Sequence, residues 1–334
     1  MKILVIGLGS MGKRRLRNLK ALNIDNIIGF DLREDRRIEA ENKYKIKTFG
    51  TFEEAIEQRP DVFIISTPPD THIDYQLYAA KSNIPFLAED SVVKDGIEEL
   101  IEIVNQKNIV GYPSSTLRFH PSVKKVKELV DNNEIGTLCT FTYHAGQYLP
   151  DWHPWENVTD FYASKRETGG AREIVAFELR WLTWIFGDIK SVYGDVKKTL
   201  DFGADIDDIY QVLLFFKSGL VAHMLIDVVS RVFYRTLRLL GEEGVIEWEW
   251  LEKKVKCYKS KINNWEIYNL GSGTTIEGYD ESVIEEPYIN ELKEFLDAVK
   301  GKDKASFTLE EDYHILDILY KIEESSEKKK MISI

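Results

Sequence analysis

Over roughly the first 120 residues, short apolar runs alternate with amphipathic segments of helical length. Runs of four to six apolar residues between such segments are typical of strands that are buried on both faces. The pattern predicts strands at 2–6, 27–31, 62–66, 84–88 and 109–112, and helices near 11–22, 53–58, 71–82 and 95–106. Because strands and helices alternate, we expect a parallel sheet covered by helices on both faces.

After Pro121 the pattern changes to period-two and β-branched runs. Strands are predicted at 137–147, 189–197, 207–217, 219–229, 234–241, 245–250 and 253–259, with helices at 122–131, 171–186, 287–300 and 309–327. Short polar turns join several of these runs, which favours antiparallel pairing. The second half is therefore predicted to be an α+β domain with a large, mainly antiparallel open sheet.

Three glycines follow the first predicted strand at the G-x-G-x-x-G spacing: Gly7, Gly9 and Gly12. The first permits a tight turn, the second a close approach of a pyrophosphate, and the third close packing of the next helix. Ser10 and Met11 at the start of that helix are predicted to bind the cofactor, because a helix N-terminus offers free N–H groups to the phosphates. A glycine-rich turn of any α/β protein could show the same spacing. Here a strand, the glycines, a helix and an acid occur in order, which predicts an α/β Rossmann domain over 1–121, followed by the α+β domain over 122–334. The last helix is a candidate to pack back on the first domain.

Asp31 is the acid that ends the second apolar run, about twenty residues after the glycines. A carboxylate there can accept hydrogen bonds from both ribose hydroxyls and would repel a 2′-phosphate, so NAD is expected rather than NADP. Arg33, Arg36 and Arg37 are the counter-evidence, because a nearby cation can accommodate that phosphate. Arg33 could instead cover the adenine.

The composition of the chain argues against some classes of binding partner. The 334 residues are 43% hydrophobic and carry a net charge of −12, which argues against nucleic acid or an anionic membrane as the main partner. The basic stretch 13–17 is expected to be the solvated face of a helix. Cys139 and Cys257 are expected to be buried apolar residues in a reducing compartment. Since no apolar stretch reaches the length of a membrane span, we expect a cytoplasmic protein.

Several local motifs extend beyond the glycines. They are the opening GLGSMGKRRLRNL, the turn 66–72, the run 86–89, the stretch 117–121 and the Trp-Ile-Phe-Gly run 184–187. Together these motifs resemble the glucose–fructose oxidoreductase, inositol dehydrogenase and MocA family across essentially the whole chain. The resemblance implies an NAD(P)-dependent oxidoreductase of a sugar, nucleotide sugar or cyclitol. It also implies a homo-oligomer assembled through the C-terminal sheet, which forms the substrate floor.

The resemblance assigns further cofactor residues. Thr67 and Pro68 would line the nicotinamide half of the cofactor, with His72 close by. A helix N-terminal residue that packs against the loop is the alternative for His72. Glu89 matches the glutamate of the family's Glu-Lys-Pro triplet, which holds the cofactor ribose.

The sequence departs from the family at two catalytic positions. The lysine of the triplet is Asp90, the aspartate of the second catalytic motif is Glu173, and the histidine four residues later is Phe177. A carboxylate can replace such groups only if desolvation or a neighbouring anion raises its pKa toward neutrality. We therefore predict Glu173 and Asp90 as acid–base groups that share a pocket. The alternatives are a solvated loop acid or helix cap for Asp90 and a surface helix acid for Glu173.

Residues 144–156 leave a strand and enter a loop dense in aromatic rings. Such rings suit a sugar, whose C–H face stacks while its hydroxyls seek polar partners, so His144, Tyr148 and Trp152 are predicted to bind substrate. His153 is the histidine best placed to act as an acid or base, with His144 second. Packing between domains is the alternative role of this loop. No metal is expected, because no further His or Cys lies at ligand spacing.

Arg172 and Arg180 lie eight residues apart on one predicted helix. A planar guanidinium could bind a carboxylate or phosphate of the substrate, and Arg172 is the predicted candidate. An ion pair with Glu173, Glu178 or an acid of another domain is the alternative.

Together these observations predict an NAD-dependent oxidoreductase of a modified, anionic or nucleotide-activated sugar, with noncanonical carboxylate or histidine acid–base groups. Two alternatives stay open at this point. One is a noncatalytic NAD-binding sensor or subunit, and the other is a lyase or glycosidase that uses transient oxidation by NAD.

Overall fold

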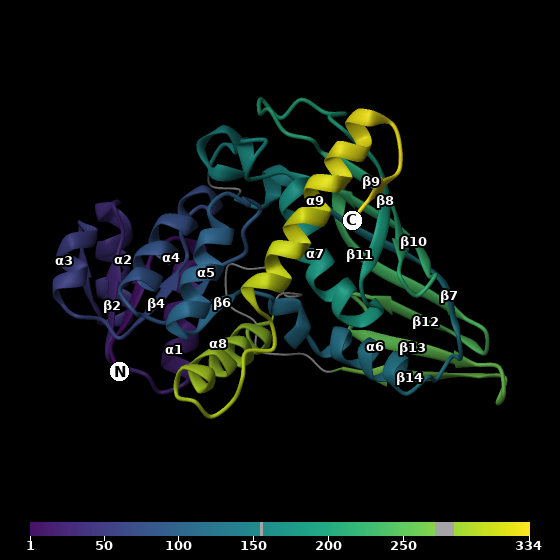
Figure 1. Ribbon diagram of the computed structural model, residues 1–334, viewed down its shortest axis with the longest axis horizontal. Helices are drawn as coiled ribbons and strands as arrows, with labels where there is room; N and C mark the ends of the chain where they lie inside the picture. The colour runs from purple at the N-terminus through teal and green to yellow at the C-terminus, as the bar shows by residue number, and fades with distance from the viewer. Residues whose placement is uncertain (154–155, 271–283) are drawn as a thin grey trace. The chain divides into compact units, whose positions relative to one another are not determined.

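The structure is a computed structural model that describes residues 1–153, 156–270 and 284–334. The chain divides into two compact units (Figure 1). Unit 1 comprises Met1–Thr116 and Glu285–Tyr313, and unit 2 comprises Leu117–Ile284 and His314–Ile334. Relative to the expected domains, the division falls at 116/117 rather than at 121/122, and a segment from the end of the chain joins unit 1.

Unit 1 contains a six-stranded parallel sheet in the order β3-β2-β1-β4-β5-β6. Its strands are β1 (Ile3–Ile6), β2 (Ile27–Phe30), β3 (Lys47–Phe49), β4 (Val62–Ile65), β5 (Phe86–Ala88) and β6 (Gly111–Pro113). Successive residues of β1 enter different cores: Ile3 and Val5 face one, and Leu4 and Ile6 face the other. The sheet is therefore buried on both faces, which explains its short, continuously apolar strands.

Helices cover both faces of this sheet. They are α1 (Ser10–Ala21), α2 (Glu34–Tyr44), α3 (Phe52–Glu57), α4 (His72–Lys81), α5 (Ile97–Lys107) and α8 (Glu286–Val299), with the 3₁₀ helix η1 (Pro69–Thr71). One core contains Leu16 of α1 together with Leu292 and Phe295 of α8, and the other contains residues of α3, α4 and α5. The Rossmann prediction is confirmed.

Three features of unit 1 differ from the prediction. Helix α2 and strand β3 were not predicted, because α2 buries only Ala40 and Tyr44 in an otherwise charged sequence and β3 has three residues. The helix that joins unit 1 is α8, whereas most of the last helix, α9 (Leu309–Lys328), belongs to unit 2. A helix of ordinary amphipathic character gives no sign of which sheet its apolar face will cover.

Unit 2 is built on a nine-stranded sheet in the order β14-β13-β12-β11-β7-β10-β9-β8-β15. Its strands are β7 (Leu138–Tyr148), β8 (Ile189–Lys197), β9 (Ile209–Phe216), β10 (Val221–Asp227), β11 (Val229–Gly241), β12 (Gly244–Glu249), β13 (Lys254–Lys259), β14 (Asn264–Asn269) and β15 (Ile332–Ser333). Every pairing is antiparallel except that of β7 with β10. The mainly antiparallel sheet is therefore confirmed, while β14 and β15 are additions to the prediction.

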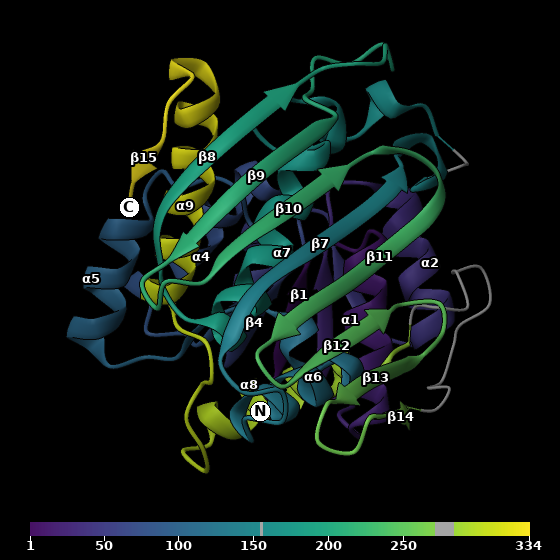
Figure 2. The ribbon, with the colours of Figure 1, turned by 90° about the vertical axis from the view of Figure 1, so that its right-hand side faces the viewer.

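The helices of unit 2 pack on one face of this sheet, here called the inner face. They are α6 (Pro121–Asp131), α7 (Ala171–Phe186) and α9, with the 3₁₀ helices η2 (Thr116–Phe119), η3 (Leu149–Asp151), η4 (Val158–Asp160) and η5 (Tyr162–Ser164). The other face, here called the outer face, is turned to the viewer in Figure 2. Alternate strand residues on it, including Tyr193, Leu213 and Val221, are exposed.

The two cysteines are both free, and they differ in environment. Cys257 is buried in β13, as predicted, whereas Cys139 is exposed in β7, so that prediction was wrong for Cys139. Cys139 lies near the start of β7, where the pairing with β11 shifts register between Leu240 and Gly241 and both Cys139 and Thr140 are exposed. Within the described ranges, no helix is both long enough and apolar enough to cross a bilayer.

Candidate active site

The glycine turn of unit 1 has the geometry of a phosphate-binding loop. Gly7 has φ +87°, and a Cβ atom there would lie 2.6 Å from the carbonyl oxygen of Ser66. A Cβ atom on Gly12 would lie 1.8 Å from the carbonyl oxygen of Gly7. Helix α1 starts at Ser10, directly after Gly9, and has no acidic residue in its first turn. The positive end of this helix is therefore open to a pyrophosphate, so the turn fits a dinucleotide.

Asp31 follows β2 and is held by the backbone around it. Its Oδ2 accepts a hydrogen bond of 2.7 Å from the N–H of Leu8, and its Oδ1 accepts one of 2.8 Å from the N–H of Arg33. Each carboxylate oxygen keeps a further lone pair for a ribose hydroxyl. The first of these bonds ties the acid directly to the glycine turn.

The three arginines after Asp31 point to different partners. Arg33 pairs with the exposed Asp35, and Arg37 donates to the backbone carbonyls of Asp31 and Leu32. Arg36 lies 3.7 Å from Oδ2 of Asp31, and its guanidinium would lie 3.2 Å from a Cβ atom on Gly9. Of the three arginines, Arg36 is therefore the one that lies nearest the glycine turn. The sequence had suggested Arg33 as the cofactor residue, and a role of Arg33 in cofactor binding stays a prediction.

The loop after β4 holds the next predicted cofactor residues, Thr67 and Pro68. His72, the first residue of α4, is buried and places its Nε2 2.7 Å from the carbonyl oxygen of Thr67. A carbonyl only accepts, so Nε2 carries the proton. Burial lowers the pKa of His72, which keeps the ring neutral. His72 thus holds the loop at Thr67 by a hydrogen bond to its backbone. This contact matches the alternative role of His72, a helix N-terminal residue that packs against the loop.

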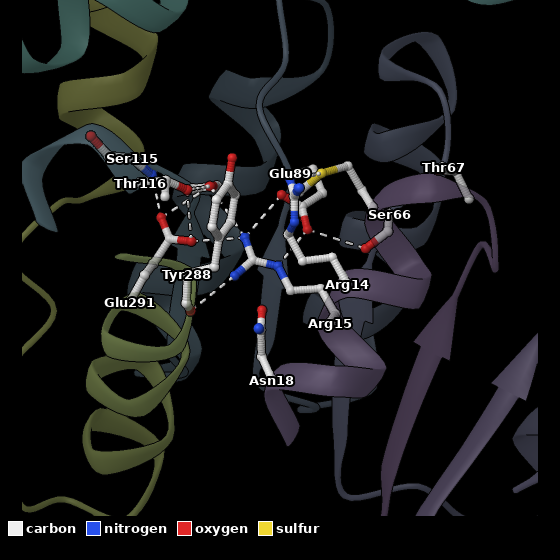
Figure 3. A network of polar contacts seen from close by, with 12 residues as sticks. Arg14, Arg15, Asn18, Ser66, Thr67, Glu89, Ser115, Thr116, Tyr288 and Glu291 are labelled. Carbon is white, nitrogen blue, oxygen red and sulfur yellow. Dashed lines mark hydrogen bonds and ion pairs between the residues drawn. The ribbon is translucent and has the colours of Figure 1, made fainter. Parts of the chain in front are cut away.

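Glu89 directly follows β5 and takes part in a buried polar network (Figure 3). Arg15, fully buried on α1, donates to Oε1 of Glu89 at 2.6 Å and to Oε2 at 2.9 Å. The same guanidinium donates at 2.7 Å to Glu291 of α8, which also accepts from Ser114, Thr116 and the N–H of Ser115. The hydroxyl of Ser66 also donates to Oε1 at 3.2 Å, so both Glu89 oxygens are fixed in position and Oε2 keeps a lone pair for a ribose hydroxyl.

This network corrects the interpretation of the basic stretch 13–17 as a solvated helix face. Arg14 and Arg15 are buried, and Arg14 pairs with Glu285 at 3.0 Å. Asn18 donates to the other oxygen of Glu285. The arginines of α1 thus face carboxylates of the segment 285–291, more than 260 residues away in the sequence, whereas Lys13 pairs with Glu39.

Asp90 and Glu173, the two predicted catalytic carboxylates, lie in different units. The carboxylate oxygens of Asp90 are buried, so Asp90 is not a solvated loop acid. A pocket shared by the two residues stays a prediction.

Glu173 lies in the first turn of α7 with its carboxylate withdrawn from solvent. Oε1 accepts a hydrogen bond of 2.9 Å from the hydroxyl of Tyr162. Oε2 is buried and has no hydrogen-bond partner among the described residues. Burial raises the pKa of Glu173 to about 7, against the smaller opposing effect of Tyr162. Desolvation, rather than a neighbouring anion, therefore gives this carboxyl the proton affinity of a general acid–base group.

His153 and Trp152 lie in the loop that follows β7. The Nδ1 of His153 lies 2.6 Å from Oε1 of Glu156, and its ring packs 4.5 Å from the ring of Phe161. Phe161 in turn contacts the ring of Tyr162. The indole nitrogen of Trp152 is buried, with no hydrogen-bond partner in the part of the chain that is described. Pro154 and Trp155 of this loop lie outside the described residues.

His144 lies apart from this group. Tyr143 donates to Glu178 of α7 and therefore faces inward, so strand alternation turns His144 to the outer face. There its Nε2 lies 2.7 Å from Oδ2 of Asp227, and its ring packs on Tyr234. The sheet separates His144 from α7, and we leave His144 out of the proposed catalytic set.

Tyr148 and Arg172 both have protein partners. The guanidinium of Arg231 lies 3.7 Å from the centre of the Tyr148 ring. Arg172 pairs with Glu323 of α9 at 2.7 Å and donates to the carbonyl of Glu167. The ion-pair alternative thus describes Arg172, although with an acid that the sequence did not suggest. Substrate binding by either residue stays a prediction.

Three residues of these networks were missed by sequence reasoning: Arg15, Glu291 and Tyr162. Arg15 was noticed only as one charge in a basic stretch, and Glu291 is one acid of a charged helix. Tyr162 lies eleven residues before Glu173, in a loop whose path the sequence does not reveal. In the described ranges, no three His, Cys, Asp or Glu side chains are grouped to hold a metal ion.

Comparisons with known proteins agree with this geometry. Residues 1–110 match the model of an oxidoreductase family with an NAD-binding Rossmann fold, and residues 123–247 match that of the GFO/IDH/MocA C-terminal domain. The myo-inositol 2-dehydrogenase of Thermotoga maritima is 25% identical over 353 residues, covering 100% of this chain and 98% of that protein.

Solved structures share the fold over the whole chain. An oxidoreductase from Agrobacterium radiobacter in complex with NAD+, L-tartaric acid and magnesium has a TM-score of 0.87 at 13% identity, covering 100% of this chain and 98% of that one. Levoglucosan dehydrogenase in complex with NADH and levoglucosan has a TM-score of 0.86 at 17% identity, covering 100% and 99%. The WlbA dehydrogenase of Bordetella pertussis with NADH and UDP-GlcNAcA has a TM-score of 0.81 at 15% identity, covering 100% and 98%.

Proposed function

Because the chain belongs to the Gfo/Idh/MocA family of NAD-dependent oxidoreductases, we propose that Glu173 is the acid–base group of a sugar dehydrogenase. In the oxidative direction, a carbinol carbon gives up a hydride and its hydroxyl gives up a proton. Glu173 accepts that proton on Oε2, and in the reductive direction it returns it. The noncanonical residue thus takes over the task of the family's lysine and histidine.

Unit 1 supplies the residues that hold the cofactor. The glycine turn and the start of α1 bind the pyrophosphate, Asp31 binds the adenosine ribose, and Glu89 and Thr67 lie on the nicotinamide side. NAD, when bound, supplies the hydride acceptor. The strand order supports this assignment, because β2 with Asp31 and β5 with Glu89 lie on opposite sides of β1.

The observation that carries the proposal is the Oε2 atom of Glu173. It is buried without a hydrogen-bond partner among the described residues, on a carboxyl whose pKa is about 7. A buried acceptor without a partner costs free energy, which a substrate hydroxyl would offset. A carboxyl with this pKa can both take and return a proton near neutral pH.

The substrate class rests on the relatives and on the ring-rich loop. Relatives act on or bind myo-inositol, levoglucosan, L-tartaric acid and UDP-GlcNAcA, and two of these ligands are anionic. Trp152 has an indole N–H that could meet a sugar hydroxyl. We therefore propose a modified, anionic or nucleotide-activated sugar as the substrate.

A noncatalytic NAD-binding sensor is the second candidate. It is favoured by Phe177, which stands where the family has a histidine and whose ring lies 6.0 Å from the Arg235 guanidinium. Neither a phenyl ring nor a guanidinium takes up a proton at neutral pH. A sensor would bind NAD without any exchange of hydride with a sugar.

A screen of nicotinamide absorbance separates the two candidates. Cyclitols, anhydrosugars, sugar acids and nucleotide sugars are each offered with NAD, and the corresponding keto compounds with NADH. The dehydrogenase predicts a change of absorbance with at least one compound and a change at least about a hundredfold slower with Glu173→Gln. A sensor predicts a melting-temperature shift with NAD, no further shift with any sugar, and no change of absorbance. A lyase or glycosidase would convert the sugar without net change of the nicotinamide.

We also propose that the outer face of the nine-stranded sheet binds a second copy of this chain. Exposed apolar side chains on neighbouring strands support this, including Tyr193 (38% exposed), Leu213 (39%) and Val221 (36%). Light scattering should report an oligomer for the natural protein and a smaller species for Leu213→Asp. A monomeric natural protein would refute the proposal.

A further inference from the structure

We infer that Tyr162 is a positioning residue for Glu173: its hydroxyl occupies Oε1, so that Oε2 is the oxygen that exchanges the proton with the substrate. The inference rests on the proposed role of Glu173. It adds a residue that neither the family motifs nor the sequence patterns assign.

The hydrogen bond itself selects the reacting oxygen. Tyr162 donates to Oε1 across 2.9 Å, and Oε2 has no such partner within the described ranges. In the ionised carboxylate both oxygens accept. In the protonated acid the oxygen without the proton still accepts, so the bond from Tyr162 persists if the proton is on Oε2. Protonation of Oε1 would instead compete with this bond, and the proton is therefore directed to Oε2.

The loop holds Tyr162 firmly against the start of α7. The carbonyl oxygen of Tyr162 accepts from the Thr168 hydroxyl at 2.7 Å and from the N–H of Lys165 at 3.2 Å. A Cβ atom on Gly169 would lie 2.1 Å from the Cα of Ala163, so only glycine allows this contact between the two ends of the loop. The tyrosine and the helix that carries Glu173 therefore form one local unit.

Two arginines near Glu173 in the sequence pair with other carboxylates, whereas Tyr162 donates a hydrogen bond to Glu173 itself. Arg172, adjacent in sequence, pairs with Glu323, and Arg166 of the same loop pairs with Asp205 and Asp207. Tyr162 is the one titratable side chain shown in hydrogen-bond contact with Glu173 among the described residues. Burial raises the pKa of Glu173, and the bond from Tyr162 opposes that rise.

The proton balance of the reaction shows why this matters. NAD, when bound, would accept the hydride with the electron pair of the carbinol C–H bond, and the carbon–oxygen bond would become double. The hydroxyl proton moves to Oε2, and Glu173 later releases it to water. A single free oxygen gives that proton a defined destination.

Difference infrared spectroscopy of the cofactor-free protein tests the inference without a substrate. The carboxyl band that disappears in Glu173→Gln identifies Glu173, and its titration midpoint is expected at about pH 7. Tyr162→Phe, which removes the donor, should raise the midpoint by about one pH unit. Site-specific 3-fluorotyrosine at position 162 should lower it, because fluorine makes the phenol a stronger donor.

Tyr268→Phe is the matched control, since Tyr268 donates to Glu266 at the surface of the same unit. It should leave the Glu173 midpoint unchanged. A midpoint that stays in place in both position-162 variants overturns the inference, whatever the activity of Glu173→Gln. Full turnover of Glu173→Gln with a substrate overturns the proposed function instead, even where the midpoint moves as expected.

Discussion

Arg15 and Glu89 form a two-pronged ion pair, with distances of 2.6 and 2.9 Å from the guanidinium nitrogens Nε and Nη2 to the two carboxylate oxygens. The pair joins the helix that follows the glycine turn to the end of β5. Glu291 of α8 binds the same guanidinium, so three separate parts of unit 1 meet at one buried cation (Figure 3).

Removal of this cation should destabilise the protein strongly. Arg15→Met leaves Glu89 and Glu291 without their common partner in a buried site, and such a loss typically costs about 3–5 kcal/mol. Arg33→Met is the control, because Arg33 pairs with Asp35 at the exposed surface and should change stability by no more than about 1 kcal/mol. Urea unfolding measures both variants, and equal stabilities of the two would contradict a structural role for the network.

The same network shows where sequence reasoning fails. The stretch Lys13–Arg17 has the composition of a solvated helix face, and nothing local marks Arg14 and Arg15 as buried. Their partners Glu285 and Glu291 lie more than 260 residues further along the chain. A single sequence does not reveal contacts between such distant segments, because many acids could serve equally well.

Other parts could be predicted because their determinants are local. Gly7 and Gly12 are required by backbone approaches within a few residues, and Asp31 binds the turn that the glycines form. The sheet face on which His144 lies could not be predicted from the sequence, for a different reason. Its face depends on the register of a long strand, and a shift by one residue inverts every side chain.

Asp31 should make NAD bind at least about tenfold more tightly than NADP, a difference of roughly 1.4 kcal/mol. The 2′-phosphate would meet a carboxylate that the backbone holds in place. Asp31→Ser should reduce the difference in affinity between NAD and NADP. Asp35→Ser, which removes an exposed acid from the same loop, should leave this difference unchanged. Calorimetric titration of both cofactors decides, and equal affinities in the natural protein would indicate that Arg36 controls the ribose pocket.

The raised pKa of Glu173 should also appear in the stability of the fold. Folded Glu173 keeps its proton up to about pH 7, whereas in the unfolded chain it loses it near 4.5, so its contribution to stability falls as the pH rises between these values. Glu173→Gln should therefore gain stability over the natural protein by up to about 3 kcal/mol above pH 7. At pH 4 the two should differ much less. Melting curves across this range measure the effect, and a constant difference would contradict the shifted pKa.

Trp152 should contribute to sugar binding rather than to NAD binding. Trp152→Ala is expected to weaken binding of the sugar substrate by roughly 1–3 kcal/mol, because stacking and burial of the ring are lost together. Trp265→Ala, at a 39% exposed position in β14, should leave the affinity unchanged. Calorimetry with the sugar found by the absorbance screen measures both, and equal affinities would leave the ring-rich loop with a packing role only.

The most direct test of the account is the rate of single-turnover hydride transfer in Glu173→Gln. The rate is measured from the nicotinamide absorbance, with the first sugar that the natural enzyme is found to oxidise. Loss of the acid–base group should slow this step by at least about a hundredfold while the affinity for NAD stays the same. A rate within a few-fold of that of the natural enzyme would contradict the assignment of Glu173 and place the proton transfer on another residue.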